Sequence, residues 1–436
     1  MTATTPTIPA PTPAPAPTPV GDTPVSPPPR LTYVAYPTSL TLGSANAIHT
    51  YSLTQALRGQ VSHLALLVPR FARRPSRFTE VGATHLARLP FNAGRHLLDS
   101  IGWSYAERTW FAGRVLAYLV HARLRRRAPE ILYIRDAVVG AWLAFFARRL
   151  SGAKVVYECH DLEGQNPSAQ SGPITRRLAT LIDRTVMRRA DGVVSLTHAF
   201  VAALNARPDV RPRSPVAVIP DAYDDAVFFP RERTAARTTL ALDPDAFTVV
   251  YVGSTWKYRG IDRLIAAFAA FVVDQPDSRL VLVGGRRIEQ AEAIAVAQRH
   301  NIATAVQCVG AHPQAVVAQY MAAADALVLV DTVSKASASP LKLFEYAACA
   351  RPIILTDLPA LREVLPDNAA QWVTPGDTDA LADAFRQIAA YPAAASAMGM
   401  RAADAVRPHT YGARAAAVVA FCTRIARTAH VAKAAR

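Results

Sequence analysis

Short apolar segments alternate with longer segments of helical character along most of the chain. From Leu31 onward, nearly continuous apolar runs of strand length recur in this way. Such runs are typical of strands buried on both faces, and their alternation with helices predicts a parallel sheet covered on both sides. The runs of the first half are LTYVAYP (31–37), HLALLVP (63–69), ILYI (131–134), KVVYEC (154–159), DGVVSL (191–196) and VAVIP (216–220).

The same pattern restarts after a connection rich in Asp, Pro and Arg. The second set is FTVVYVG (247–253), RLVLVGG (279–285), AVQCVG (305–310), ADALVLV (324–330) and PIILT (352–356). A chain of 436 residues is long for one core, so two domains are the natural expectation. The pattern therefore predicts an α/β protein with two doubly wound, Rossmann-like domains that face a central cleft, where ligands of such sheets bind.

We expect five parts along the chain. The first 29 residues are rich in Pro, Thr and Ala, which predicts a disordered tail. The expected parts are the tail (1–29), an N-terminal domain (30–222), a linker (223–246), a C-terminal domain (247–405) and a C-terminal helix that packs back on the N-terminal domain (406–436).

Composition narrows the class of protein. The chain carries a net charge of +15, which favours an acidic partner such as a nucleotide, a nucleic acid or an anionic membrane. A nucleic-acid-binding protein is disfavoured because no reading motif accompanies the two sheet patterns. A nicotinamide dehydrogenase is disfavoured because no G-x-G-x-x-G follows the first strand of either set.

The cysteines and the apolar runs indicate the cellular compartment of the protein. The four cysteines are far apart and show neither metal-ligand nor redox-motif spacing, as expected for buried thiols in a reduced cytoplasmic chain. No apolar run reaches the roughly 18 to 20 residues that span a bilayer, and the N-terminus does not resemble a secretory signal. We therefore expect a cytoplasmic protein, and we expect no metal site.

The stretch Ser334–Glu363 carries the clearest chemistry. Ser339 is a suitable N-cap, and Pro340 suits the first turn of the helix that follows. The start of such a helix presents free N–H groups to a phosphate, and the carboxylate of Glu345 could accept hydrogen bonds from paired sugar hydroxyls. The alternative is an ordinary capped helix with Lys342 and Glu345 in solvent.

Taken together, the motifs between residues 31 and 411 resemble a family-4 glycosyltransferase of the GT-B architecture. The resemblance rests on VVYVGSTWKYRGIDRLIAAF (249–268), VIPDAYDDAVFFP (218–230), ADALVLV (324–330) and SPLKLFEYAACARPIILTDLPALREV (339–364). It implies a retaining, metal-independent enzyme that uses a nucleotide sugar, UDP- or GDP-linked, as co-substrate and needs no further cofactor. It also implies an acceptor-side N-terminal domain and a donor-binding C-terminal domain.

The resemblance assigns donor-side roles residue by residue. Glu345 would hold the ribose hydroxyls, and the backbone around Ser339, Leu341 and Lys342 would hold the diphosphate. Arg259, helped by Lys257, would neutralise the departing phosphate, a contribution that raises the rate because the charge grows in the transition state. For Lys257 and Arg259 the alternative is a solvated loop. The other donor-side candidates are Gly43, Gly253, Ser337 and Glu363, and for Glu363 a surface position at a helix start is about equally expected.

Two departures from the family pattern bear on activity. Ser337 stands where relatives often carry a second glutamate, and Ser254-Thr255 replaces Arg-Leu after Gly253. They leave open a catalytically weak GT-B protein that serves as a binding or partner subunit. We favour a working enzyme.

Candidate acceptor-side residues come from the first domain. His160, at the end of KVVYECHD, matches a histidine that faces the transferred sugar in relatives, and Asp161 lies beside it. Asn46 and His49 follow the first strand, although His49 could equally cap a helix or lie on the surface. Arg135 either binds the acceptor or pairs with Asp136.

An Arg-rich region completes the prediction. Residues 70–127 contain 12 Arg against three acidic residues, with aromatic residues between them. Such a face suits an anionic membrane, although a layer of solvated arginines is equally expected. We therefore expect an acceptor that is a glycan or lipid-linked, used in cell-surface polysaccharide or glycoconjugate synthesis at the inner membrane face.

Overall fold

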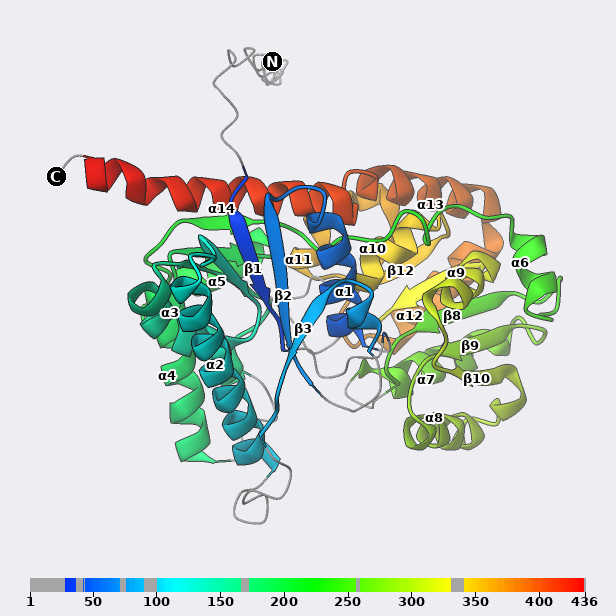
Figure 1. Cartoon of the computed structure of the whole chain (residues 1–436). Helices are drawn as coiled ribbons and strands as arrows, with labels where there is room; N and C mark the ends of the chain where they lie inside the picture. The colour runs from blue at the N-terminus through cyan, green and yellow to red at the C-terminus, as the bar shows by residue number, and fades with distance from the viewer. Residues whose placement is uncertain are drawn as a thin grey trace, which may run out of the picture.

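The computed structural model describes residues 28–36, 42, 44–70, 76–89, 100–165, 172–255, 259–330 and 341–434. Within these ranges the chain forms two parallel sheets, one in each of two lobes (Figure 1). This confirms the predicted fold class. The predicted tail, apart from Pro28 and Pro29, and the candidates Gly43, Lys257, Ser337 and Ser339 lie outside the described residues, and the domain limits stay a prediction.

The first sheet has the strand order β3-β2-β1-β4-β5-β6-β7, with every pair parallel. Its strands are β1 (Arg30–Val34), β2 (His63–Pro69), β3 (Ala83–Leu86), β4 (Ile131–Ile134), β5 (Lys154–Cys159), β6 (Gly192–Ser195) and β7 (Val216–Val218). The helices that connect them are α1 (Ala45–Leu57), α2 (Ser100–Leu124), α3 (Ala137–Ser151), α4 (Pro173–Arg189) and α5 (His198–Asn205).

The second sheet has the order β10-β9-β8-β11-β12-β13, again parallel throughout. Its strands are β8 (Thr248–Val252), β9 (Arg279–Val283), β10 (Val306–Gly310), β11 (Ala326–Leu329), β12 (Ile353–Thr356) and β13 (Gln371–Val373). Its helices are α7 (Ile261–Val272), α8 (Arg287–Arg299), α9 (Gln314–Ala323), α10 (Leu341–Ala348), α11 (Pro359–Arg362), α12 (Thr378–Ala390) and α13 (Pro392–Val406).

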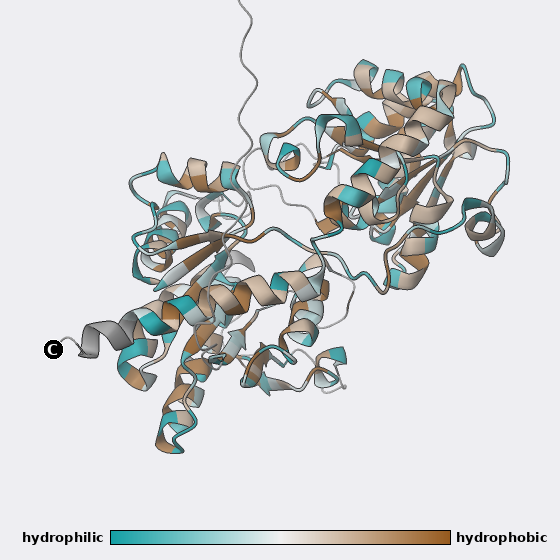
Figure 2. Cartoon of the chain, turned by 90° about the horizontal axis from the view of Figure 1, so that it is seen from above, coloured by the Kyte–Doolittle hydropathy of each residue, from teal (hydrophilic) through white to brown (hydrophobic). Residues whose placement is uncertain are grey.

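Each sheet is buried on both faces, as the apolar runs predict. Alternate residues of β8 divide between two core clusters: Val250 packs on one face and Val249 on the other. The first sheet divides in the same way between Tyr133 and Leu132. Figure 2 shows the result from above, with hydrophobic strands enclosed by helices whose outer faces are more polar.

The C-terminal helix α14 (Tyr411–Ala434) belongs structurally to the first lobe. Val418, Phe421 and Cys422 join the core cluster that contains Leu31 and Tyr33 of β1. Figure 1 shows α14 lying along the first lobe after the chain has completed the second. No described helix has the length and apolar character needed to cross a membrane.

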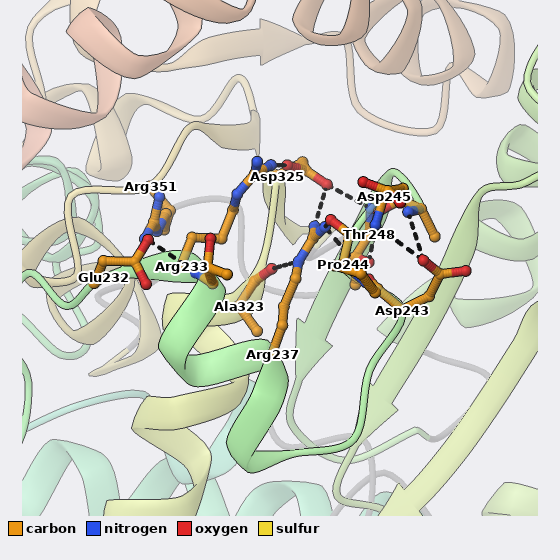
Figure 3. A network of polar contacts seen from close by, with 12 residues as sticks. Glu232, Arg233, Arg237, Asp243, Pro244, Asp245, Thr248, Ala323, Asp325 and Arg351 are labelled. Carbon is orange, nitrogen blue, oxygen red and sulfur yellow. Dashed lines mark hydrogen bonds and ion pairs between the residues drawn. The ribbon is translucent and has the colours of Figure 1, made fainter.

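Two segments cross side by side between the lobes. The backbone N–H of Tyr223 donates to the carbonyl of His409, and the N–H of Tyr411 donates to the carbonyl of Tyr223. The first crossing segment leads into α6 (Arg233–Thr239), which is anchored to the second lobe (Figure 3). There the buried guanidinium of Arg237 donates to Asp325, which also accepts the N–H of Thr248 at the start of β8.

Candidate active site

A cleft of about 590 Å³ lies at the carboxyl ends of both sheets. This is the edge at which open α/β sheets bind ligands. The first lobe contributes Leu42, Ser44, Ala45, Ile48, His160, Asp161 and Leu196. The second contributes residues 251–254, Arg259, residues 283–286, Glu289, Ala311, His312, Gln314, Val317, Leu329, Val330, Leu341 and Lys342.

The wall formed by the second lobe includes bare backbone, because glycines follow β8 and β9. Gly284 has a φ of +118°, and a Cβ placed on it would lie 2.2 Å from the carbonyl oxygen of Gly253. Only glycine allows the turns after β8 and β9 to approach this closely. A ligand in the cleft can therefore approach bare main chain at Gly253, Gly284 and Gly285.

Glu289 holds the loop at Ser254 and Thr255, where the sequence departs from the family pattern, through hydrogen bonds. Its carboxylate accepts from the Ser254 hydroxyl at 3.0 Å and from the Thr255 N–H at 2.9 Å. Arg286 donates to the same carboxylate at 2.8 Å and also lines the cleft. The loop that lacks the usual arginine is thus held in place, and a different arginine stands beside it.

Lys342 and Glu345 form a pair at the start of α10. The Lys342 ammonium lies 2.5 Å from a Glu345 carboxylate oxygen, and the glutamate is 1% exposed. Burial raises the pKa of Glu345, while Lys342 opposes that shift. Lys342 and Leu341 line the cleft directly, whereas Glu345 lies behind the lysine. The alternative of two solvated side chains is thereby wrong for Glu345.

A network of paired side chains lies behind the wall of the first lobe and reaches the cleft at His160. His160 holds Glu158 through Nε2, and its Nδ1 lies 3.1 Å from an Arg135 nitrogen. Burial, with Arg135 beside the ring, lowers the pKa of His160 to about 4. The ring is therefore neutral at pH 7, with Nε2–H donating to Glu158 and Nδ1 accepting from Arg135. Both ring nitrogens already have protein partners, so a hydrogen bond to a sugar requires one of them to move.

Glu158, which the sequence did not single out, is the centre of this network. It is fully buried, and its carboxylate contacts the Tyr133 hydroxyl and lies 3.1 Å from Arg414 of α14. Burial alone would raise the pKa of Glu158, but Arg414 and the two nearby histidines hold it well below its usual value. Arg414 also donates to the carbonyls of Ile219 and Pro220, next to the crossing segment.

His49 lies between two carboxylates and is 1% exposed, so its predicted surface alternative is wrong. Its Nδ1 is 3.1 Å from Asp221 and its Nε2 is 3.3 Å from Glu158. Burial would raise the pKa of Asp221, but the His49 contact, with Arg414 nearby, lowers it to about 2. His49, Glu158 and His160 have spacing that could hold a metal ion. The guanidiniums at 3.1 Å and 3.7 Å from Glu158 already supply the positive charge that such an ion would bring.

The remaining candidates are placed as follows. Asp161 lines the cleft beside His160, whereas Asn46, in the first turn of α1, is half-buried and outside the cleft lining. Asp136 does not take Arg135 as its partner: it caps α3 by accepting from the N–H of Val139. Glu363 joins the two lobes, accepting at 2.6 Å from the N–H groups of His198 and Ala199 in the first turn of α5.

Sequence reasoning missed four residues of this region: Glu158, Arg286, Glu289 and Arg414. Arg286 could have been found, because it follows Gly284-Gly285 at the end of a predicted strand. Glu158 could have been noted as a charged residue just before the end of a strand whose central positions, 155–157, are uncharged. Glu289 and Arg414 carry no local signal of these roles, because Glu289 holds Ser254 and Thr255, at least 34 positions earlier, and Arg414 pairs with the still more distant Glu158.

Two family models match the chain. The "Glycosyl transferase 4-like domain" matches residues 46–222, and "Glycosyl transferases group 1" matches residues 246–390. A curated relative named D-inositol 3-phosphate glycosyltransferase, from Segniliparus rotundus, is 28% identical over 224 residues. That match covers 50% of this chain and 49% of the relative, so the chain spans about half the length of this relative.

Solved structures share the whole fold. Sucrose-phosphate synthase from Thermosynechococcus elongatus matches with a TM-score of 0.72 and 20% identity, over 91% of this chain and 99% of that one. Anabaena Alr3699/HepE, in complex with UDP and glucose, matches with a TM-score of 0.69 and 16% identity over the same shares. At these identities the likeness concerns the fold alone. Because the two family models together match most of the sequence and the two lobes have this architecture, the chain belongs to the family-4-like glycosyltransferases of GT-B fold.

Proposed function

We propose that the protein is a retaining glycosyltransferase that moves a sugar from a nucleotide-sugar donor to a glycan or lipid-linked acceptor. The observation that carries the proposal is the cleft itself. Bare backbone and cationic side chains on one wall face a neutral histidine and an aspartate, His160 and Asp161, on the other. A phosphate-bearing donor suits the first wall, and an acceptor hydroxyl suits the second.

On the donor side, the start of α10 would hold the diphosphate, and the glycine turns would let it approach the main chain closely. Free backbone N–H groups at a helix start and the dipole of the helix attract anions. When the donor binds, the Lys342 ammonium would move from Glu345 to a phosphate. The Glu345 carboxylate would then be free to accept hydrogen bonds from the ribose hydroxyls. A UDP-linked sugar is the first donor to test, because the Anabaena neighbour is described in complex with UDP-glucose.

The transfer proposed is a front-face displacement. The bond from the sugar's anomeric carbon to the diphosphate oxygen breaks, and the electron pair leaves with the diphosphate. The acceptor oxygen bonds to the same face of that carbon, and its proton passes to the departing phosphate oxygen. Arg259, Arg286 and Lys342 line the cleft and would stabilise the growing phosphate charge, an effect worth about 10²–10³ in kcat for a well-placed donor.

On the acceptor side, we propose a hydroxyl bound near Asp161, in a cytoplasmic protein that meets its acceptor at the inner membrane face. The acceptor is part of a cell-surface polysaccharide or glycoconjugate. D-inositol 3-phosphate belongs in the acceptor panel, because curated relatives carry that name.

The test is a thermal-shift screen with UDP-, GDP-, ADP- and dTDP-sugars, followed by transfer assays with the donor that binds. A ligand at about one hundred times its Kd stabilises the folded protein by about 2.7 kcal/mol. We expect one nucleotide class to raise the Tm. The Glu345→Ala variant should lose that rise, because the ribose loses its acceptor.

Glu292→Ala, an exposed glutamate on α8, is the matched control and should keep the full rise. A Tm that no nucleotide sugar changes would refute donor binding. A rise that persists in Glu345→Ala would refute the ribose assignment alone.

A further inference from the structure

Helix α4 exposes a stripe of large aliphatic side chains. Ile174, Leu178 and Leu181 are 80%, 42% and 56% exposed. Their spacing of four and three residues places them on one side of the helix. The opposite side is the buried one and contains Ala179, Asp183, Val186 and Met187. The stripe is therefore an outward face, separate from the packing of α4 on its own lobe.

The outward face continues onto α3. The guanidinium of Arg189, near the end of α4, lies 4.4 Å from the ring centroid of Phe145. Phe145 is 36% exposed, and Trp142, one turn earlier on α3, is 41% exposed. We call this surface the α3–α4 face and define it by Trp142, Phe145, Ile174, Leu178, Leu181 and the arginines of both helices. Figure 1 shows both helices on the side of the first lobe that faces away from the second lobe.

The charge of this face is mainly positive, although Asp191, just after α4, lies 3.7 Å from Arg148. The two helices carry seven arginines, and their one acidic residue, Asp183, is 2% exposed. Asp183 accepts from the N–H groups of Glu163 and Gly164, so its charge is directed inward. The arginines are Arg148, Arg149, Arg176, Arg177, Arg184, Arg188 and Arg189.

We propose that the α3–α4 face docks on an anionic lipid bilayer. A helix that lies in a membrane interface inserts apolar side chains below the headgroups while its arginines contact the anionic phosphates. Each basic residue near such a surface contributes about 1 kcal/mol, and burying a leucine side chain contributes about 1.5–3 kcal/mol. A nucleic acid would use the arginines but leave the aliphatic stripe in water, so a bilayer fits both components of the face.

The face is linked to the cleft by Asp183. The turn that it holds, at Glu163 and Gly164, follows Asp161 in the cleft wall by two residues. A membrane-bound α4 would tether the first lobe, which carries this wall, to the bilayer that holds a lipid-linked acceptor. This last step rests on the proposed function, whereas the docking itself does not.

The experiment is flotation of the full chain with phosphatidylcholine vesicles, with and without roughly one third phosphatidylglycerol. We expect binding to the anionic vesicles only, and weaker binding as salt rises. The Leu178→Asp/Leu181→Asp variant should partition at least about tenfold less, because two aliphatic anchors are lost and two negative charges are added. The matched control is Val273→Asp/Met400→Asp, which alters exposed residues of the second lobe and should bind as the wild type does.

Three outcomes would overturn the proposal. The wild type could ignore anionic vesicles, the α4 variant could bind them fully, or the face could instead join two copies of the chain. In the last case the variant would turn a dimer into a monomer without any vesicle present. The nucleotide-sugar thermal shift, measured without vesicles, should be equal in all three proteins. If that shift is absent while flotation behaves as expected, the proposed function fails and the docking surface stands.

Discussion

The two walls of the cleft are built in opposite ways. The wall of the first lobe is supported from behind by side chains that hold each other, with Glu158 bound by His160, Tyr133 and Arg414. The wall of the second lobe includes backbone exposed at glycine turns, and Lys342 and Arg286 line it beside them.

This difference suits the two ligands proposed. Phosphates are bound well by main-chain N–H groups and a few cations, so the donor wall needs close backbone approach more than fixed side chains. A neutral sugar hydroxyl needs a polar group in one protonation state and one orientation. The paired network supplies both for His160, so substitutions in the two walls should fail for different reasons.

The largest effect is expected from Arg414→Met. This change leaves the fully buried Glu158 without its strongest cation, and breaking a buried pair costs about 3–5 kcal/mol. It also removes the donor to the carbonyls of Ile219 and Pro220. Chemical denaturation should show the lower free energy of unfolding. The double variant Arg414→Met/Glu158→Gln should recover part of that free energy. If the double variant is destabilised by the sum of the two single effects, the pairing is contradicted.

A Gly284→Ala change tests the other wall. The added Cβ would lie 2.2 Å from the Gly253 carbonyl oxygen at a φ that alanine disfavours. The free energy of unfolding should therefore fall by about 3 kcal/mol, and the rise in Tm with a nucleotide sugar should be lost. Gly113→Ala is the matched control. Gly113 lies within α2 with nothing near its Cβ position, so alanine should stabilise it by about 0.5–1 kcal/mol. Equal effects at the two sites would contradict the close approach of the turns.

Acid titration tests the paired wall without disrupting it. The folded pKa of His160 is about 4, below the usual 6.5, so the unfolded chain binds the extra proton first as the pH falls. Stability attributable to this ring is complete above pH 6.5 and decreases, by up to about 3 kcal/mol, as the pH falls to 4. His160→Asn should flatten that part of the stability profile. Parallel profiles for wild type and His160→Asn would refute a neutral, buried ring.

The fold was predictable because its strands are continuous apolar runs. The pattern missed only short edge strands among the described residues: β3 reads ATHL and β13 reads QWV, too short and too mixed to stand out. Interior strands such as β4 and β12 are buried at every position and were found. A strand that is buried on both faces needs an apolar residue at nearly every position, whereas a short edge strand does not, so only the first kind is recognisable in the sequence.

The candidate site was predictable only where one segment carries the signal. Lys342 and Glu345 share a helix turn, and His160 and Asp161 share a strand end, so local sequence indicated both pairs. The partners of His160 are Arg135, directly after β4, and Glu158 of β5, which in turn contacts Arg414 of α14, and no local pattern unites these three residues. Donor and acceptor roles of the individual residues stay predictions until ligand binding is measured.

The smallest effect is expected at the contact that joins the walls. Glu363, at the end of α11, accepts from the first two N–H groups of α5, so each lobe supplies half of one helix cap. Glu363→Gln removes the charge and one acceptor oxygen, which should cost about 1 kcal/mol. Because the contact spans the two lobes, the change should also broaden their relative arrangement in small-angle scattering. The control Glu130→Gln, at an exposed position of the first lobe, should change neither the stability nor the scattering. If the scattering of Glu363→Gln is also unaltered, the paired crossing segments alone fix the relative arrangement of the lobes.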